Sequence, residues 1–321
     1  MHRSSVLKYI IKRAAMAVIV LLLVTVIIFI AIRLAPGDPI KNQLGPYGEA
    51  SEERIEAIKR QLGLDKSYVM QYLLWLKSCF QGNFGLSLRN GQPVIEVIMQ
   101  KIPVSLELIT VSLIFALLLA IPLGILAAIK KDSVFDQLVS IFSTSFLAFP
   151  TFGVGLILMI IFAVKLKILP ANGYIPFSEN PAMNIKLLTM PALSLGLFEL
   201  ANFVRFIRSD TLEVINSNYI RTAKAKGLPK SKVYFKHAFK NILVTLITVV
   251  GLEFGTLLGG TIIVEQLFGW SGLGWLIYQS VGNRDYPVVQ TAVLFIAVAF
   301  VIINTIIDIL YAAIDPRIKL E

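Results

Sequence analysis

Long apolar runs separated by shorter polar segments dominate the chain. A helix needs about 20 apolar residues to cross the hydrocarbon core of a bilayer. Six runs come close to this length or exceed it, and they predict an all-α membrane protein with six transmembrane helices. The first run exceeds the apolar core of a signal peptide and no small-residue cleavage site follows it, so we expect a retained span. The predicted spans are 14–32, 106–129, 138–164, 187–204, 242–264 and 288–312.

Composition and charge add an orientation to this pattern. The 321 residues are 56% hydrophobic with a mean hydropathy of +0.75, which is too apolar for a soluble domain of this size. Lys and Arg gather before the first span, between the second and third, between the fourth and fifth, and after the sixth. The positive-inside rule therefore predicts that both termini are cytoplasmic. The net charge of +10 then reflects orientation next to membrane lipid, and no signature of nucleic-acid binding accompanies it.

The polar segment between the first and second spans is long, and we expect it to form a small helical cap on the outer face. Residues 51–64 space their apolar side chains as a helix does, with acidic residues in the first turn. Residues 67–80 are a second helix candidate, rich in aromatic side chains.

The segment between the fourth and fifth spans is intensely basic. Residues 205–240 contain nine Lys or Arg and only two acidic residues, Asp210 and Glu213. Strong helix formers precede Gly227, a residue type that commonly ends a helix, and Pro229 prevents simple continuation. This pattern predicts a short helix, a sharp turn and a second helix. It fits docking to a soluble partner, and it fits equally well a loop attracted to anionic lipid.

The sequence Arg221-Thr-Ala-Lys-Ala-Lys-Gly227, preceded by Asn218-Tyr219, resembles the coupling-loop (EAA) motif of ABC-importer permeases. The resemblance is to the peptide and nickel branch, which usually carries Arg-Thr-Ala in place of Glu-Ala-Ala. Thr245 and Ser271 stand where that branch commonly has Pro. Further matches run along nearly the whole chain: Pro36-Gly-Asp-Pro39, Gly82-Asn-Phe-Gly85, Leu169-Pro170, Gly259-Gly-Thr-Ile-Ile-Val-Glu265, Phe268-Gly-Trp-Ser-Gly-Leu-Gly274, Arg284-Asp-Tyr-Pro-Val-Val-Gln290 and Tyr311-Ala-Ala-Ile-Asp-Pro-Arg317.

The resemblance implies a type I ABC importer permease in a bacterial or archaeal cell (inner) membrane. The expected partners are a second homologous permease subunit, two ATPase subunits that would bind ATP and Mg²⁺, and an extracytoplasmic solute-binding protein. It also implies a division into 1–105 (first span plus outer helical loop), 106–312 (permease core with coupling loop 205–241) and 313–321 (cytoplasmic tail). The residues expected to contact the ATPase are Tyr219, Arg221, Thr222, Ala223, Lys224, Ala225, Lys226 and Gly227.

Beyond the fifth span, the resemblance implies a re-entrant outer element that faces the binding protein. Its candidate residues are Glu265, Phe268, Gly272, Leu273 and Gly274. An aromatic belt at the membrane interface is the alternative for Trp270 and Trp275. Within the fifth span, small residues recur at four-residue spacing (Gly251, Gly255 and Gly259). They favour close helix packing inside the chain, with a permease–permease interface or a pore lining as alternatives.

Glu199, Glu253 and Asp308 are acidic residues inside apolar spans. Such groups are costly in a membrane and often functional. They could contact a peptide ammonium group or a cation on the pathway, or they could be neutralised in helix packing, for example by Arg205.

Nothing in the sequence predicts an enzyme or a bound cofactor. It holds no Gly-x-x-x-x-Gly-Lys-Ser/Thr phosphate loop, so we expect ATP hydrolysis on separate subunits. One Cys and two His, too far apart in sequence to pair, predict no metal site. Peptides, including glutathione, are the expected substrates, with nickel or a metal chelate as the alternative. A proton- or sodium-coupled secondary transporter is the rival class, although its usual paired repeats are not seen.

Overall fold

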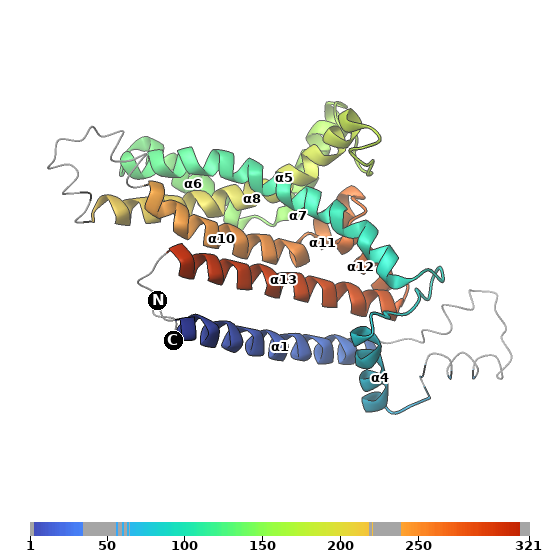
Figure 1. Cartoon of the computed structure of the whole chain (residues 1–321). Helices are drawn as coiled ribbons and strands as arrows, with labels where there is room; N and C mark the ends of the chain where they lie inside the picture. Colours follow the sequence, from blue (N-terminus) through green and yellow to red (C-terminus); the bar gives the residue numbers. More distant parts are fainter. Residues whose placement is uncertain are drawn as a thin grey trace. The chain divides into compact units, whose positions relative to one another are not determined.

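A computed structural model of the chain describes residues 3–34, 65–217 and 239–314, together with residues 56, 60, 63 and 220 (Figure 1). This part of the chain consists of helices and connecting turns, and its only β-type pairing is an isolated bridge between Leu86 and Pro93. Four of its helices are long and apolar enough to cross a membrane, or up to six spans if each of two bent helix pairs counts as one. The predicted helix 51–64 lies outside the described residues apart from 56, 60 and 63.

Four of the predicted apolar runs lie in single helices, which confirms them as helical. These helices are α1 (Arg3–Leu34), α5 (Val94–Ile129), α8 (Pro181–Ile215) and α13 (Tyr286–Ile314). The weakest run in the sequence, 187–204, lies in α8, which continues through Pro191 and is the most buried of the four. Its lower hydropathy therefore reflects contact with protein rather than with lipid.

The third predicted run is not one straight helix. It is divided into α6 (Val134–Ala148), α7 (Thr151–Leu158) and the π-helix η1 (Met159–Lys165), with a bend of 100° at the break. Phe149 at the break is extended (φ −96°, ψ 133°), as expected for a residue that precedes proline. Pro150 has no N–H to donate to the preceding turn, so the helix ends and restarts in a new direction.

The fifth run also bends. It forms α10 (Phe239–Gly260) and α11 (Ile262–Phe268), whose axes differ by 55°. The break follows a pair of glycines, Gly259 and Gly260, a common cause of helix kinks.

The helices divide between two compact units, and the first comprises the described residues of Met1–Pro103 and Gly272–Val301. It contains α4 (Tyr68–Phe80), which confirms the predicted helix 67–80 and begins where the Ser67 side chain accepts a hydrogen bond from Met70 N. The Tyr72 hydroxyl lies 2.9 Å from Thr25 Oγ1 of α1, and Arg33 Nη2 donates to Gln71 Oε1 at 3.0 Å. These contacts tie α4 to α1.

A hydrophobic cluster joins the remaining parts of the first unit. Its members come from the start of α5, from α12 (Leu273–Gly282) and from the start of α13. Asp285, between the latter two helices, accepts hydrogen bonds from Ser87 Oγ (2.5 Å) and Leu88 N (3.0 Å), so the loop before α5 is fastened to the same place.

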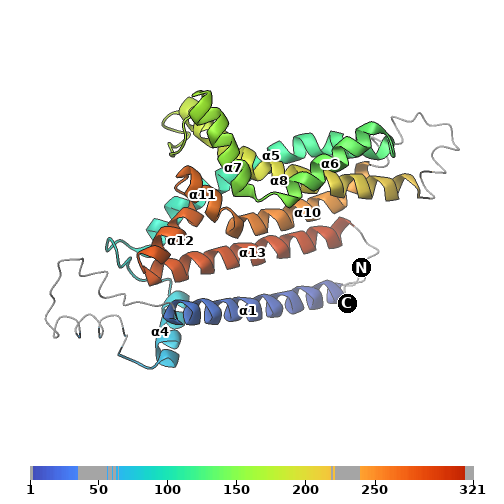
Figure 2. The ribbon, with the colours of Figure 1, turned by 180° about the vertical axis from the view of Figure 1, so that it is seen from behind.

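The second unit comprises Val104–Ser271 and the described residues of Ile302–Lys319, and α8 is its centre. Helices α6, α7, α10 and α11 all pack against α8 (Figures 1 and 2). The predicted close approach at the first glycine of the α10 stripe is confirmed, because a Cβ atom on Gly251 would lie 2.3 Å from Ile307 Cδ1 of α13. Intrachain packing therefore explains Gly251.

Candidate functional site

The predicted ATPase contact lies between α8 and α10, and its residues fall outside the described part of the chain: Tyr219, Arg221, Thr222, Ala223, Lys224, Ala225, Lys226 and Gly227. The two ends of this segment are described. Helix α8 stops at Ile215, where Asn216 N donates to Glu213 O, and Ile220 is fully buried. The predicted coupling residues thus follow the central helix of the second unit after a single capped turn.

An ion pair that the sequence did not reveal braces the chain near this segment. Arg208, two helical turns before the end of α8, bonds Asp136 at the start of α6 through Nε to Oδ1 (2.5 Å) and Nη2 to Oδ2 (2.8 Å). Asp136 also accepts a hydrogen bond from Asp132 N at 2.9 Å, in the turn between α5 and α6. The ion pair therefore links α6 to α8, and the hydrogen bond from Asp132 N joins the turn after α5 to the same carboxylate. The only sequence signal was a pair of opposite charges, each just outside a predicted span (138–164 and 187–204).

The predicted outer element is a helix–turn–helix. Helix α11 ends at Phe268, and Gly269 turns the chain with a left-handed backbone (φ 59°) that a residue with a side chain rarely adopts. Trp270 N donates to Glu265 O at 2.9 Å, and Gly173 N donates to Phe268 O at 2.9 Å. The turn is thus fixed both to α11 and to the loop that precedes α8.

Glu265 anchors this turn from inside the second unit. Its side chain is fully buried, and Oε1 accepts hydrogen bonds from Ser105 Oγ at 2.6 Å and Thr261 Oγ1 at 3.0 Å. Phe268 is buried as well. Glu265 and Phe268, which were predicted to lie on the binding-protein side, are therefore buried within the fold, where they support the turn after α11.

Trp270 is fully buried, so the aromatic-belt interpretation is wrong for this residue. Its Nε1 donates to Val104 O at 2.9 Å, and Tyr174 packs edge-on against its ring with centroids 4.7 Å apart. Tyr174 lies in the loop before α8, and burial raises the pKa of its hydroxyl above the ordinary value. Trp270 thus connects α5, the outer turn and that loop.

The other candidates of the outer element belong to the first unit. Gly272, Leu273 and Gly274 are all buried at the start of α12. Leu273 is part of the hydrophobic cluster that includes Val94 and Ile98 of α5. Their positions indicate a packing role within that unit.

Two of the three acidic residues predicted inside spans belong to one polar cluster of the second unit. Glu253 of α10 accepts a hydrogen bond from Asn202 Nδ2 of α8 at 2.8 Å. Glu199 lies one turn before Asn202 on α8, is 2% exposed, and has no hydrogen-bond partner for Oε2 among the described residues. Asp308 of α13 is half-buried and makes an interaction of its own.

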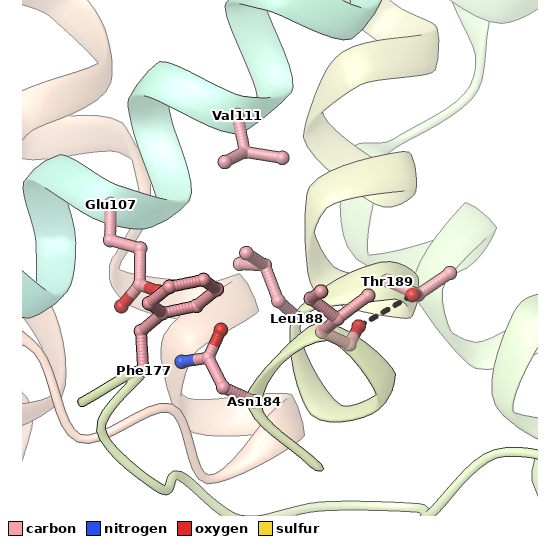
Figure 3. A pocket seen from close by; sticks show the side chains of 7 residues that line it. Glu107, Val111, Phe177, Asn184, Leu188 and Thr189 are labelled. Atoms are coloured by element: carbon pink, nitrogen blue, oxygen red, sulfur yellow. Dashed lines mark hydrogen bonds between the residues drawn. The ribbon is translucent and has the colours of Figure 1, made fainter. Parts of the chain in front are cut away.

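A cavity of about 230 Å³ lies in the second unit between α5, α8 and the loop before α8 (Figure 3). Glu107 and Asn184 provide polar groups at one end of it, while Val111, Phe177 and Leu188 form apolar walls (Figure 3). Sequence reasoning missed both polar residues, and the one available signal was an acidic residue near the start of the second predicted span. In the described residues, no group of three or more His, Cys, Asp or Glu could hold a metal ion.

The long apolar helices, together with the two bent helix pairs, indicate a multi-pass membrane protein. The chain matches the family described as "Binding-protein-dependent transport system inner membrane component" over residues 120–320, and the corresponding N-terminal family over residues 6–109. It belongs to this family of ABC-importer permeases, as the Arg221–Gly227 motif and the matches around it predicted.

Two relatives and one solved structure illustrate the match. The chain is 40% identical to the oligopeptide transport system permease protein AppB of Bacillus subtilis, over 97% of this chain and 99% of that protein. It is 37% identical to the glutathione transport system permease protein GsiC of Escherichia coli, over 98% and 99% respectively. The fold is similar to a chain of the inward-facing MetNI methionine ABC transporter (TM-score 0.56, 18% identity, 70% of this chain and 98% of that one).

Proposed function

We propose that this chain is a permease subunit of an ATP-driven importer that translocates di- or oligopeptides, or glutathione, delivered by a solute-binding protein. The observation that carries the proposal is the near full-length similarity to a permease named for oligopeptide transport and to one named for glutathione transport. Substrate identity comes from those relatives. Selection between peptides would rest largely with the binding protein.

The proposed topology has six spans, with both termini in the cytoplasm of a bacterial or archaeal cell. The bent pair α6 with α7–η1 forms the third span, and the pair α10 with α11 forms the fifth. Residues 1–105 supply the first span and the outer helical loop, residues 106–312 the permease core, and residues 313–321 a cytoplasmic tail. The distribution of Lys and Arg supports this orientation.

Coupling to ATP hydrolysis is proposed to pass through residues 205–241. The segment Arg221–Gly227 would dock on one of two separate ATPase subunits, which would bind ATP and Mg²⁺. Ala223 and Ala225 would permit close approach, and Lys224 and Lys226 would meet acidic groups or water at the rim. Because the segment follows α8 directly, its movement would reach the helix on which α6, α7, α10 and α11 pack.

On the other side of the membrane, the turn between α11 and α12 is proposed to face the binding protein. The buried anchors Glu265, Phe268 and Leu273 would hold this turn in shape. A second homologous permease chain would complete the pathway. The polar cluster around Glu199 and Glu253 is one region that could face it.

Uptake by the reconstituted importer tests this function. The permease, its partner permease and the ATPase subunits are placed in liposomes with ATP on the ATPase side, and the binding protein is added outside with labelled trileucine, glutathione or nickel. We expect accumulation of a peptide that requires the binding protein. Accumulation of nickel alone would assign the chain to the metal-transporting members, and uptake without ATP would exclude the proposed class.

A further inference from the structure

We infer that the cavity between α5, α8 and the loop before α8 binds a primary ammonium group attached to an apolar body. Its volume of about 230 Å³ is below the roughly 300–1,000 Å³ of pockets that enclose drug-sized ligands. It therefore takes the end of a molecule, such as a headgroup or a chain terminus, rather than a whole peptide.

The polar side chains of the cavity offer hydrogen-bond acceptors and no free donor. Asn184 is 0% exposed; its Nδ2 donates to Ile175 O at 2.9 Å and its amide also interacts with Glu107, which fixes the orientation of the amide group. Asn184 Oδ1 is buried and has no hydrogen-bond partner within the described part of the chain. Thr189 Oγ1 donates its proton to Ile185 O at 2.6 Å and keeps only its lone pairs. A ligand must therefore supply the donors.

The charge and the apolar walls of the cavity further restrict the class of ligand that can bind. Glu107 brings a carboxylate, so a cation is favoured, and an ammonium group presents three N–H donors to the available acceptors. Calcium needs six to eight oxygen ligands, which this cavity does not provide. The remaining walls are apolar, and the ring of Phe177 lies beside Glu107 (Figure 3), where it can also stabilise a cation. A primary ammonium group next to an apolar body matches all of these features.

The position of the cavity along α5 indicates where the ligand comes from. At a rise of roughly 1.5 Å per residue, Glu107 lies about 33 Å along the helix from its end at Ile129, beside the cytoplasmic Lys130 and Lys131. The hydrocarbon core is about 30 Å thick, so in the proposed orientation the cavity opens at its outer boundary. Two sources of the same chemistry reach this level: the N-terminus of an incoming peptide, which rests on the proposed function, and the headgroup of phosphatidylethanolamine.

The test uses the importer complex with the full-length chain, either unaltered or carrying Glu107→Gln. Glu96→Gln is the matched control, since Glu96 is an exposed carboxylate on the same helix. In the first arm, the complex in phosphatidylglycerol nanodiscs is titrated calorimetrically with trileucine and with N-acetyl-trileucine, which lacks the ammonium group. In the second arm, native mass spectrometry compares bound phosphatidylethanolamine with phosphatidylcholine of equal chain length, whose quaternary nitrogen has no N–H.

We expect the amine to bind in preference to its blocked partner in at least one arm. Glu107→Gln should weaken that binding roughly tenfold or more, the scale of one lost hydrogen bond to a charged group, while Glu96→Gln leaves it unchanged. Glu107→Asp, which keeps the charge, should retain part of the preference. If Glu107→Gln weakens binding in the first arm, the ligand is the peptide N-terminus. If it weakens binding in the second arm, the ligand is the lipid headgroup.

The inference is overturned if Glu107→Gln and Glu96→Gln behave alike in both arms, or if blocked and free amines bind equally. ATP-driven uptake of trileucine, measured on the same preparations, separates this failure from failure of the proposed function. If trileucine is taken up but binding depends on Glu107 in neither arm, the inferred ammonium site is wrong and the proposed function still holds. If trileucine is not taken up but the lipid preference depends on Glu107, the ammonium site holds and the proposed function is wrong.

Discussion

Breaking the ion pair between Arg208 of α8 and Asp136 of α6 should destabilise the permease more than removing an exposed charge from α8. In Arg208→Ala, the Asp136 carboxylate loses both of its contacts with the guanidinium group, at 2.5 and 2.8 Å. The Asp136 side chain is only 4% exposed, so water cannot replace those hydrogen bonds. The buried charge is then left with the hydrogen bond from Asp132 N at 2.9 Å.

Removing one partner of a buried ion pair costs about 3–5 kcal/mol. Because Asp132 N remains in place, we expect the lower end of that range, about 3 kcal/mol, for Arg208→Ala. Asp136→Asn should cost less, about 1–2 kcal/mol, because the Arg208 side chain is 26% exposed and can be hydrated when its partner is neutral. The order of the two effects follows from the difference in burial.

Equilibrium unfolding of the purified permease in mixed detergent micelles measures these free energies. Arg205→Ala is the matched control, because Arg205 is exposed on the same helix and should change the unfolding free energy by less than about 0.5 kcal/mol. The double variant Arg208→Ala/Asp136→Asn closes a thermodynamic cycle, and we expect a coupling energy of roughly 1–3 kcal/mol. Additive single effects, or an Arg208→Ala variant no less stable than Arg205→Ala, would refute the bracing role of the pair.

Three further outcomes are expected. Gly227→Asp should leave the permease in the membrane but abolish ATPase association, measured by co-purification; an intact complex would contradict the docking proposal. Gly251→Ala should be about 1–3 kcal/mol less stable than Gly260→Ala, because the new Cβ meets Ile307 whereas nothing lies within 4 Å of Gly260; equal unfolding free energies would contradict the close approach. Burial raises the pKa of the Cys79 thiol to about 11 from an ordinary 9.0. The folded state therefore favours the protonated thiol, and its contribution to stability is present below pH 9 and lost as the pH rises through 11. Maleimide labelling at pH 9 should accordingly be slower in the folded protein than in detergent-unfolded protein, and equal rates would contradict the shift.

Hydropathy predicted where this chain is helical and apolar, but it could not predict the direction of the helix axes. The run 138–164 contains no charged residue, yet Pro150 in its interior redirects the chain by 100°. A proline inside an apolar run does not have a fixed consequence, since α8 continues through Pro191. The difference depends on whether neighbouring helices support a continuous axis, and that information is tertiary.

In the candidate site, too, a motif of adjacent residues could be predicted from the sequence, whereas contacts between residues far apart in the sequence could not. The Arg221–Gly227 motif is local, so the family could be identified from residues adjacent in sequence. Asp136 and Arg208 are 72 residues apart, and Glu107 and Asn184 come from different spans, so no periodicity pairs them. Trp270 looked like an interfacial aromatic because its sequence neighbourhood is rich in Gly and aromatic residues, whereas its buried hydrogen bond to Val104 O gives it a packing role.

The dependence of uptake on ATP, with the proton gradient collapsed, distinguishes an ATP-driven importer from a secondary transporter. The reconstituted importer and binding protein are supplied with labelled peptide in the presence of a proton ionophore, with ATP or with a non-hydrolysable analogue. We expect uptake to persist with ATP, to stop with the analogue and to be lost in Gly227→Asp while the permease remains in the membrane. Uptake that the ionophore abolishes, or that continues without hydrolysable ATP, would contradict it and would favour secondary transport.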